Sequence, residues 1–368
     1  MLPAKLRFEL FDRLSIKTMR YVQAVSRRSA TGLVRTIYDM IAEDFFLNGS
    51  LTSRSQVPRL LAAIWTLGRE SILVDDKVPR TDKEAMTAVL SQINDCPYCE
   101  DMLISLVHAG RAHRTAVSLF ARKRLDQIDE TLRRRIEWVR AIASFGEKDI
   151  PMTPFTKAQL PEGIAALMAM SDINRFSHVV MAASPVSAPF GLQVVKSALL
   201  RLFGVELRVT KARPLAPGRT LDLLPPAPLP PDMAWARANP RIAEAVSRWA
   251  AAVEEEAQPV IATEVQQVVA RSLGKWNGEI MPMSRSWVET EVKSLDEGDH
   301  PIARLALVLA KAPYQVDRGL VDAVVSRVAD QASFIRILAW ASYVAARSFA
   351  ARIARVSQAQ LDDIEKAA

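Results

Sequence analysis

Residues 84–110 read EAMTAVLSQINDCPYCEDMLISLVHAG and hold both cysteines of the chain, Cys96 and Cys99. Apolar residues between 86 and 93 recur at steps of three and four, which is the period of one face of a helix. An Asn-Asp pair then suits a turn, and the proline between the cysteines suits the first position of a second helix. The stretch therefore predicts a hairpin of two helices, with the cysteines where the second helix begins.

The position of the two thiols bears on their reactivity. We expect Cys96 at about the N-cap of the second helix and Cys99 in its first turn. A helix N-terminus presents free N–H groups and the positive end of the helix dipole, which favours a thiolate over a thiol. Glu100 and Asp101 act in the opposite direction, because nearby carboxylates raise the pKa of a thiol. The thiolate is therefore expected to need a nearby base.

The two cysteines could form a redox pair, half of a metal site or simply part of the core. The order Cys-x2-Cys-x8-His-x4-His ends at His108 and His113, but zinc sites usually have about 12 residues before the histidines. On a regular helix His108 is half a turn out of phase with Cys99, and the two histidines are expected to point in different directions. The spacing of Cys96 and Cys99 favours a reversible dithiol/disulfide pair, with no metal and no cofactor.

Glu84 lies 12 residues before Cys96 and is the candidate base for the thiols. In an antiparallel hairpin it lies across from about residue 105, within a turn or two of Cys99. The sequence TDKE, which ends at Glu84, also fits a capping box, with Thr81 as the N-cap and the glutamate accepting from its N–H. Helix cap and catalytic base both remain open for Glu84 at this point.

The period of the apolar residues is helical almost throughout the chain. No run alternates apolar and polar residues as a half-buried strand would. The helical runs are residues 57–76, 81–95, 130–145 and 161–181, and two helices within 319–356 that are separated near 329–332. The sequence therefore predicts an all-α fold, a helical bundle.

Residues 213–232 contain seven prolines, a density that excludes a helix interior and favours extended, semi-rigid chain. We interpret them as a linker between a larger helical domain with the CxxC, residues 1–212, and a smaller helical domain without an active site, residues 233–368. Residues 154–176 and 313–349 both run from a Pro-aromatic pair through helix to an Arg near a Phe. This echo suggests two related helical units.

Length, charge and hydropathy limit the class of protein. The chain has 368 residues, of which 49% are hydrophobic, and a formal net charge of +7. Residues 1–23 interrupt their apolar positions with charges and have no signal-peptide h-region, and no run reaches the roughly 20 apolar residues of a membrane span. The basic residues within 121–140 alternate with acidic ones and match no recognition motif. We expect a cytoplasmic protein that binds neither membranes nor nucleic acid.

Residues 84–110 resemble the core motif of the alkyl hydroperoxidase D-like, carboxymuconolactone decarboxylase superfamily. That motif is Glu, eleven residues, Cys-x-x-Cys, three residues and His, and Glu84, Cys96 and Cys99 match it in type and spacing. VPRTDKEA before it, PFTKAQLPEGIAALMAMSDINRF and a later Ser-Pro resemble the family too, as does much of the C-terminal part. The resemblance implies an all-helical homo-oligomer with peroxidase or disulfide-reductase chemistry on thiols, without haem or flavin.

Two positions depart from the family pattern. The family's His four residues after the second cysteine is Leu103 here, and a His of relatives that carry FHYINR is Ser171. In the family the Glu draws a proton from a Cys through this first His, the thiolate attacks a peroxide oxygen, and the second Cys closes the disulfide. Here Glu84 would act directly or through water, at a lower rate. Nothing in the sequence points to the lactone site that decarboxylase chemistry needs.

Two functions of different classes follow. The first is an antioxidant thiol-dependent peroxidase or disulfide oxidoreductase of reduced activity, with Cys96, Cys99 and Glu84 as catalytic residues, a peroxide or disulfide as substrate and an unknown thiol as reductant. The second is a non-catalytic helical scaffold, or a redox-responsive binding protein with a relict CxxC. The spacing from Glu84 to the CxxC favours the first function, and Leu103 favours the second.

Overall fold

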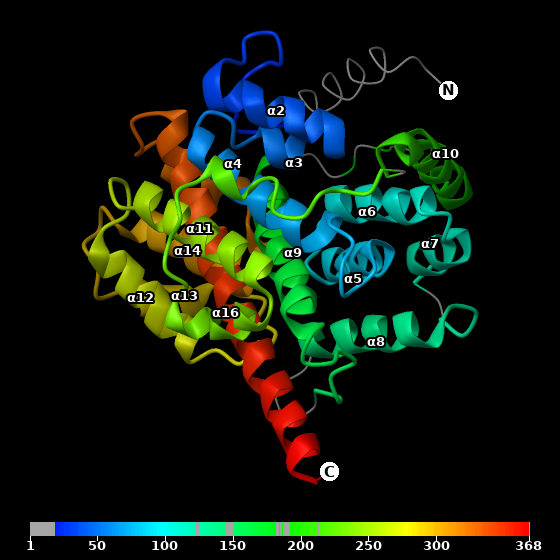
Figure 1. The fold of residues 1–368 in the computed structure, drawn as a ribbon. Coiled ribbons are helices and arrows are strands. Elements are labelled where there is room, and N and C mark those ends of the chain that lie inside the picture. Colours follow the sequence, from blue (N-terminus) through cyan, green and yellow to red (C-terminus); the bar gives the residue numbers. More distant parts are fainter. Residues whose placement is uncertain are drawn as a thin grey trace.

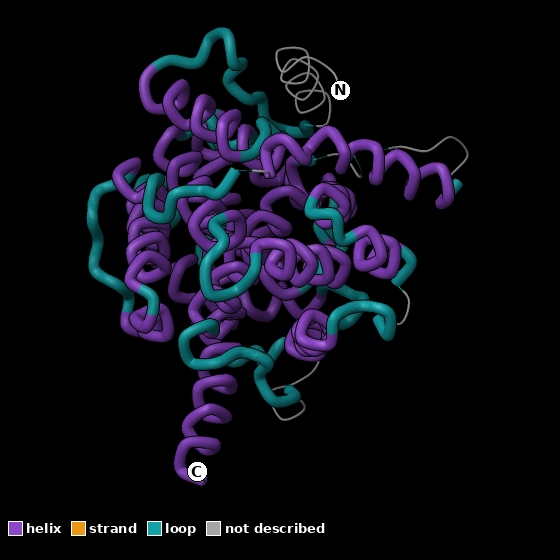
Figure 2. The backbone as a smooth tube through the Cα atoms, turned by 45° about the vertical axis from the view of Figure 1, so that its right-hand side comes forward, coloured by secondary structure: helices purple, strands orange, loops and turns teal. Residues whose placement is uncertain are grey.

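The computed structural model describes residues 19–122, 125–144, 150–181, 184, 186, 192–211 and 213–367. Within these residues the only β geometry is an isolated antiparallel bridge between Met19 and Met181. Figure 2 shows helices joined by loops throughout. The predicted all-α fold is confirmed. Most of the stretch that bears on a signal peptide, residues 1–18, lies outside the described residues, as does Pro185 of the Ser-Pro pair.

The first half of the chain forms helices close to those that the apolar period predicts. They are α2 (Gly32–Asp44), α3 (Gly49–Thr52), α4 (Pro58–Gly68) with its π-helical continuation η1 (Arg69–Leu73), α5 (Arg80–Ile93), α6 (Pro97–Ala109), α7 (His113–Phe120), α8 (Glu130–Ser144), α9 (Leu160–Val180) and α10 (Gln193–Lys211).

The second half continues with shorter helices and ends in the longest one. It contains the 3₁₀ turns η4 (Leu221–Leu223), η5 (Pro231–Ala238) and η6 (Pro313–Gln315), and the helices α11 (Pro240–Ala257), α12 (Thr263–Gly274), α13 (Ser286–Val292), α14 (His300–Lys311), α15 (Arg318–Val325) and α16 (Gln331–Ala367). The predicted break near 329–332 is the gap between α15 and α16. No helix in the described part of the chain is long and apolar enough to cross a membrane.

Helix α9 lies at the centre of the molecule (Figure 1). Of its 21 residues, only His178 is not buried. It packs against α5 on one side, and against α4 and α16 on others. The apolar residues of α9 and its buried charged residues both need cover from solvent, which explains why both halves of the chain surround it.

The proline-rich segment 213–232 has no α-helix and lies against the first half of the chain. Its Thr220 is fully buried, and the Thr220 hydroxyl donates to Glu70 Oε1 at 2.8 Å. Gly218 N–H donates to the other Glu70 oxygen at 2.8 Å. Prolines leave this stretch extended, and buried hydrogen bonds hold it in place. The division into two domains at this segment stays a prediction.

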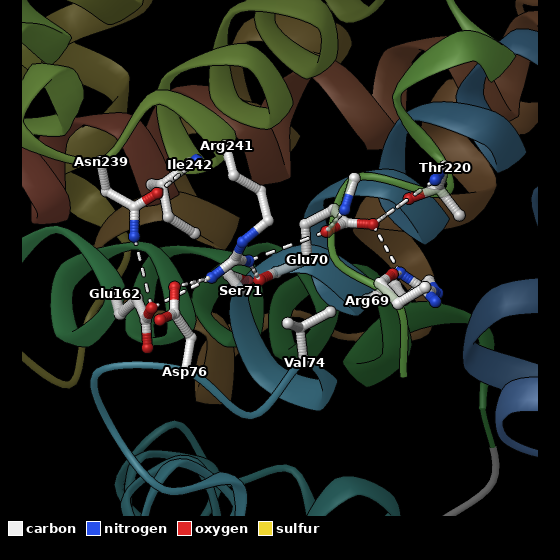
Figure 3. Close-up of polar contacts among 12 residues, drawn as sticks. Arg69, Glu70, Ser71, Val74, Asp76, Glu162, Thr220, Asn239, Arg241 and Ile242 are labelled. Atoms are coloured by element: carbon white, nitrogen blue, oxygen red, sulfur yellow. Dashed lines mark hydrogen bonds and ion pairs between the residues drawn. The ribbon is translucent and has the colours of Figure 1, made fainter. Parts of the chain in front are cut away.

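A buried polar network connects this segment to the central helices (Figure 3). Glu162 at the start of α9 is fully buried and accepts from Arg241 Nη2 at 3.0 Å and from Lys83 Nζ at 3.3 Å. Arg241 also contacts Asp76 at 3.0 Å and donates to the Glu70 main chain. Charges at this depth are costly unless they are paired, so the network fixes α5, η1, α9 and α11 against one another.

Candidate active site

The predicted helical hairpin is present and has the cysteines at the expected place. Helix α5 ends at the C-cap Asn94, and Asp95 follows with φ of 51° in the left-handed region, which Asp tolerates better than most residues. Cys96 is the N-cap of α6, and Pro97 is its first residue. α5 and α6 pack against each other. Cys99 therefore lies in the first turn of α6, as the sequence predicts.

Both cysteines are free thiols and nearly inaccessible, with exposed fractions of 1% for Cys96 and 4% for Cys99. Burial raises the pKa of the Cys96 thiol well above its usual range, and the adjacent Cys99 thiol raises it further. Asp95 adds a smaller effect in the same direction. Of the pair, Cys96 is therefore held firmly as a neutral thiol.

The carboxylates next to the CxxC do not act on Cys96 as the sequence suggests. Glu100 accepts from Gln92 Nε2 at 2.9 Å, and Asp101 is paired with Lys196 at 2.9 Å. The cause of the raised pKa is burial and not these two carboxylates, since both are turned toward other partners.

Cys99 lines a small cavity of about 70 Å³, and Cys96 does not. Its volume is several times the ~10–15 Å³ that a single water needs. The few polar groups at its wall include Asn48, Ser50 and the Tyr98 hydroxyl, which accepts from Gly49 N–H at 3.1 Å. The remainder is almost entirely apolar: Phe45, Phe46, Leu51, Trp65, Ile72, Leu73, Met102, Leu103, Leu106, Met170 and Ile173.

Leu103 occupies the position where the resembling family has its relay histidine. It is 5% exposed and lines the same cavity as Cys99, one helical turn away on α6. The predicted common face of Cys99 and Leu103 is therefore confirmed. A leucine here makes the surroundings of the Cys99 sulfur apolar and leaves no proton acceptor at this position.

Glu84 is fully buried and bound by two cations. One oxygen accepts from Arg80 Nε at 2.9 Å, and the other from Lys211 Nζ, which also donates to the main-chain oxygen of Leu106 at 3.3 Å. Leu106 is seven residues after Cys99, which corresponds to roughly 10 Å along a helix. Within the described residues no hydrogen bond joins Glu84 to either sulfur. Its role as a catalytic base stays a prediction.

The capping-box alternative for Glu84 is wrong. The N-cap of α5 is Pro79, whose main-chain oxygen accepts from Lys83 N–H at 3.1 Å, and Thr81 lies inside the helix. Both oxygens of the Glu84 carboxylate are engaged by side-chain cations instead of by a main-chain N–H of the first turn. The helix begins earlier than the TDKE pattern suggests, because Pro79 rather than Thr81 ends the preceding extended chain.

A buried arginine beside the cavity is the main feature that the sequence analysis missed. Arg54 is 1% exposed, donates to the main-chain oxygen of the cavity residue Ser50 at 2.8 Å, and pairs with Asp172 at 2.5 Å. Its guanidinium lies 3.6 Å from the centre of the Phe176 ring. Burial lowers the pKa of Arg54 to about 10, whereas the charges of Asp172 and of a Cys99 thiolate raise it. Arg54 thus lies behind the wall of the cavity that Cys99 lines, on the oxygen of Ser50.

Asp172 belongs to a buried cluster with one positive charge in excess. Burial raises the pKa of Asp172 to about 6, and the charges of Arg54 and Arg175 oppose that rise. Arg175 is 6% exposed and donates to the Ser171 hydroxyl at 2.5 Å and to the Ala310 main chain at 3.2 Å. Two guanidinium groups therefore share one carboxylate. The sequence did contain a signal for this cluster. In MSDINR, the charged residues Asp172 and Arg175 interrupt the apolar period of a helix that is otherwise expected to be buried.

The two histidines after the CxxC lie together, contrary to the prediction that they point in different directions. Their Nδ1 atoms are 3.0 Å apart. Helix α6 ends at Ala109, and Arg111 with φ of 65° turns the chain back, so the phase of a continuous helix does not apply to His113. Burial, followed by the charge of His113, lowers the pKa of His108 to about 4. Neither histidine lines the Cys99 cavity.

Comparison with known proteins gives one clear relative. The chain is 29% identical over 348 residues to the alkyl hydroperoxide reductase Rv2159c of Mycobacterium tuberculosis, and the match covers 94% of this chain and 98% of that protein. A comparison with models of protein families found no match. Similarity that extends from end to end of both chains, together with the all-helical fold and the CxxC at a helix start, supports the resemblance of this chain to the alkyl hydroperoxidase D-like family.

Proposed function

We propose that this protein reduces organic hydroperoxides with its Cys96–Cys99 pair, and that Cys99 attacks first. The observation that carries the proposal is that Cys99 lines an apolar cavity, whereas Cys96 does not and is held as a neutral thiol by burial. The similarity to a protein named alkyl hydroperoxide reductase supports the same class of reaction. An apolar wall favours a peroxide with an organic group over hydrogen peroxide, because a small polar molecule gains little there.

The reaction balances with the two thiols and one external dithiol. The Cys99 thiolate attacks the terminal peroxide oxygen, an S–O bond forms, the O–O bond breaks, and the leaving alkoxide takes up the proton that Cys99 lost. The Cys96 sulfur then attacks the Cys99 sulfenic acid, the S–S bond forms, and the hydroxyl leaves as water with the Cys96 proton. A dithiol reductant returns two electrons and two protons, and is itself oxidised to a disulfide.

In this proposal Arg54 stabilises the Cys99 thiolate by its charge, whereas the absent relay histidine would also have accepted the proton. A positive charge near a thiol favours its thiolate, and the Arg54–Asp172–Arg175 cluster holds two guanidinium groups and one carboxylate. A Cys99 thiolate would supply a second negative charge. Glu84 is assigned a positioning role, since it holds Lys211 against α6 and already accepts from two cations.

Turnover of cumene hydroperoxide with dithiothreitol as reductant tests the proposed function. The natural protein should consume peroxide and form a Cys96–Cys99 disulfide that mass spectrometry detects. Cys99→Ser should react no faster than buffer, and Cys96→Ser should be oxidised to a Cys99 sulfenic acid that dithiothreitol reduces directly, without an intramolecular disulfide. Retained turnover in Cys99→Ser would contradict the order of attack. A natural protein that shows neither turnover nor disulfide would instead favour the scaffold interpretation.

A further inference from the structure

Tyr98 is a polar side chain of the Cys99 cavity to which the proposed peroxidase chemistry gives no role. It lies between the two cysteines in the first turn of α6, is 4% exposed, and lines the same cavity as Cys99. Its hydroxyl oxygen accepts from Gly49 N–H at 3.1 Å. Gly49 stands between Asn48 and Ser50, which are both lining residues, so this contact places the hydroxyl at the wall of the cavity.

The proton of the Tyr98 hydroxyl has no acceptor. The hydroxyl donates to no group within the described residues, although its oxygen accepts from Gly49. The neighbouring polar side chains are occupied with each other, since Ser50 Oγ donates to Asn48 Oδ1 at 2.6 Å and Asn48 Nδ2 donates to the main-chain oxygen of Phe46 at 3.1 Å. A buried hydroxyl proton is normally taken by protein, water or a ligand. This proton is therefore available to a molecule inside the cavity.

An alkyl hydroperoxide needs a proton donor where its O–O bond breaks. The oxygen that carries the organic group leaves as an alkoxide, a strong base, and an apolar wall does not compensate its charge. Leu103 has no proton to donate, and Glu84 is bound by its cations roughly 10 Å further along α6. Among the side chains that line the cavity, only Tyr98 has an O–H proton that no described residue accepts.

We propose that Tyr98 is the general acid of the peroxidase reaction and makes alkyl hydroperoxides its substrate class, an inference that rests on the proposed function. As the Cys99 thiolate forms the S–O bond and the O–O bond breaks, Tyr98 gives its hydroxyl proton to the alkoxide, which leaves as an alcohol. The phenolate oxygen keeps its hydrogen bond from Gly49 N–H. A proton from water then restores the phenol and replaces the proton that Cys99 released, so atoms and charge balance.

The acidity of Tyr98 suits this role. Burial raises the pKa of its hydroxyl, the Gly49 N–H opposes that rise, and the charge of a Cys99 thiolate adds to it. The hydroxyl is therefore protonated at neutral pH, as a proton donor must be. The thiolate charge is lost when the S–O bond forms. One of the effects that hold the proton on Tyr98 thus disappears in the step in which the proton leaves.

Single-turnover oxidation of Cys99 by two oxidants tests this role. Cumene hydroperoxide releases a strongly basic alkoxide, whereas perbenzoic acid releases benzoate, which needs no proton. Tyr98→Phe should slow the reaction with cumene hydroperoxide at least ~10-fold, and it should leave the rate with perbenzoic acid within about 3-fold of the natural protein. Tyr343→Phe is the matched control, because it removes a buried hydroxyl that lies 2.5 Å from Glu254 and outside the cavity. It should keep both rates within about 3-fold.

The role of Tyr98 is excluded if Tyr98→Phe changes both rates by the same factor, as a structural role would, or if it changes neither. A natural protein that reacts with neither oxidant would overturn the proposed function, and the role of Tyr98 with it. If Tyr98→Phe does not fold, the natural protein is compared in H2O and D2O. Its reaction with cumene hydroperoxide should slow more in D2O than its reaction with perbenzoic acid, and equal slowing would exclude proton donation to the leaving oxygen.

Discussion

The two ends of helix α6 have opposite chemical characters. At its N-terminal end are the two thiols, an apolar cavity and the buried cation Arg54 behind the cavity wall. Near its C-terminal end Lys211 pairs with Glu84 and donates to the main-chain oxygen of Leu106. The contact between His108 and His113 lies at the same end. The groups that could accept a proton are thus separated from the sulfurs by about two turns of helix, roughly 10 Å.

The distance between Glu84 and the sulfurs shows that a family-like sequence spacing from Glu84 to the CxxC does not by itself place this carboxylate beside a thiol. The antiparallel arrangement of α5 and α6 does place Glu84 across from the second half of α6, as expected from the sequence. At that level Lys211, from a helix more than a hundred residues later, takes the carboxylate. The buried cation behind the cavity wall at the thiol end is Arg54, which comes from before the hairpin.

The largest expected effect comes from removing the cation at the thiol end. Arg54→Met should slow single-turnover oxidation of Cys99 by cumene hydroperoxide at pH 7 by about 10–100-fold, because the thiolate loses a nearby positive charge. Arg80→Met is the matched control, since it removes a buried guanidinium that pairs with Glu84 at the other end, and its rate should stay within about 3-fold of the natural protein.

Loss of one partner from a buried ion pair can cost ~3–5 kcal/mol, so folding must be checked by melting before rates are compared. The double variant Arg54→Met/Asp172→Asn removes both charges of the pair and should be more stable than Arg54→Met. If the folded Arg54→Met protein reacts at the natural rate, the two ends do not differ in the way described.

A histidine added at the thiol end should partly restore a proton acceptor. Leu103→His should raise the oxidation rate about 10-fold, at the low end of what general acid–base groups contribute, since the ring enters an apolar wall. The gain should persist in Leu103→His/Glu84→Gln, because Lys211 and Arg80 hold Glu84 at the other end. A gain that disappears with Glu84→Gln would revive Glu84 as the base.

A smaller effect of opposite sign is expected from Asp172→Asn. Removal of the carboxylate leaves Arg54 and Arg175 with two uncancelled charges, so the Cys99 thiolate should be favoured and the rate at pH 6–7 should rise by about 2–5-fold. The pH profile of the rate should move to lower pH, the reverse of the shift in Arg54→Met. Shifts of the same sign in both variants would mean that charge near Cys99 is not the cause.

The smallest effect concerns the histidine end, and it appears in stability rather than in rate. The pKa of His108 is about 4 in the folded protein and near 6.5 when unfolded, so the folded state binds fewer protons between these values. The contribution of neutral His108 to the free energy of unfolding is therefore complete above pH 6.5, and it is lost as the pH falls toward 4. After allowance for solvent screening, the natural protein should lose roughly 1 kcal/mol more than His108→Gln over this range.

Paired urea titrations at pH 7 and pH 4.5 measure this difference in the free energy of unfolding. The oxidation rate of His108→Gln should match that of the natural protein. A change in rate greater than about 3-fold would place the histidines in the thiol chemistry and remove the contrast between the two ends of α6.

The sequence predicted the features that depend on local patterns. The period of apolar residues predicted the helices, and an Asn-Asp turn followed by proline predicted Cys96 as the N-cap of α6. The face shared by Cys99 and Leu103 followed from helical geometry alone. These properties are decided by residues within one or two turns of each other.

The features that it did not predict depend on distant parts of the chain or on where a helix stops. Arg54 and Asp172 are 118 residues apart, and no local pattern links them. Glu84 is bound by Lys211, 127 residues away. The contact of His108 with His113 depends on the end of α6 and on the turn at Arg111, which a continuous helical phase cannot represent.

The central claim is that Cys99, in its apolar cavity, is the thiol that peroxide oxidises. The most direct test treats Cys96→Ser and Cys99→Ser side by side with one equivalent of cumene hydroperoxide in the presence of dimedone, which traps sulfenic acids. Peptide mass spectrometry should find the dimedone adduct on Cys99 of Cys96→Ser, and no adduct on Cys96 of Cys99→Ser. An adduct on Cys96 in place of Cys99, or an absence of adduct in both folded proteins, would contradict the account.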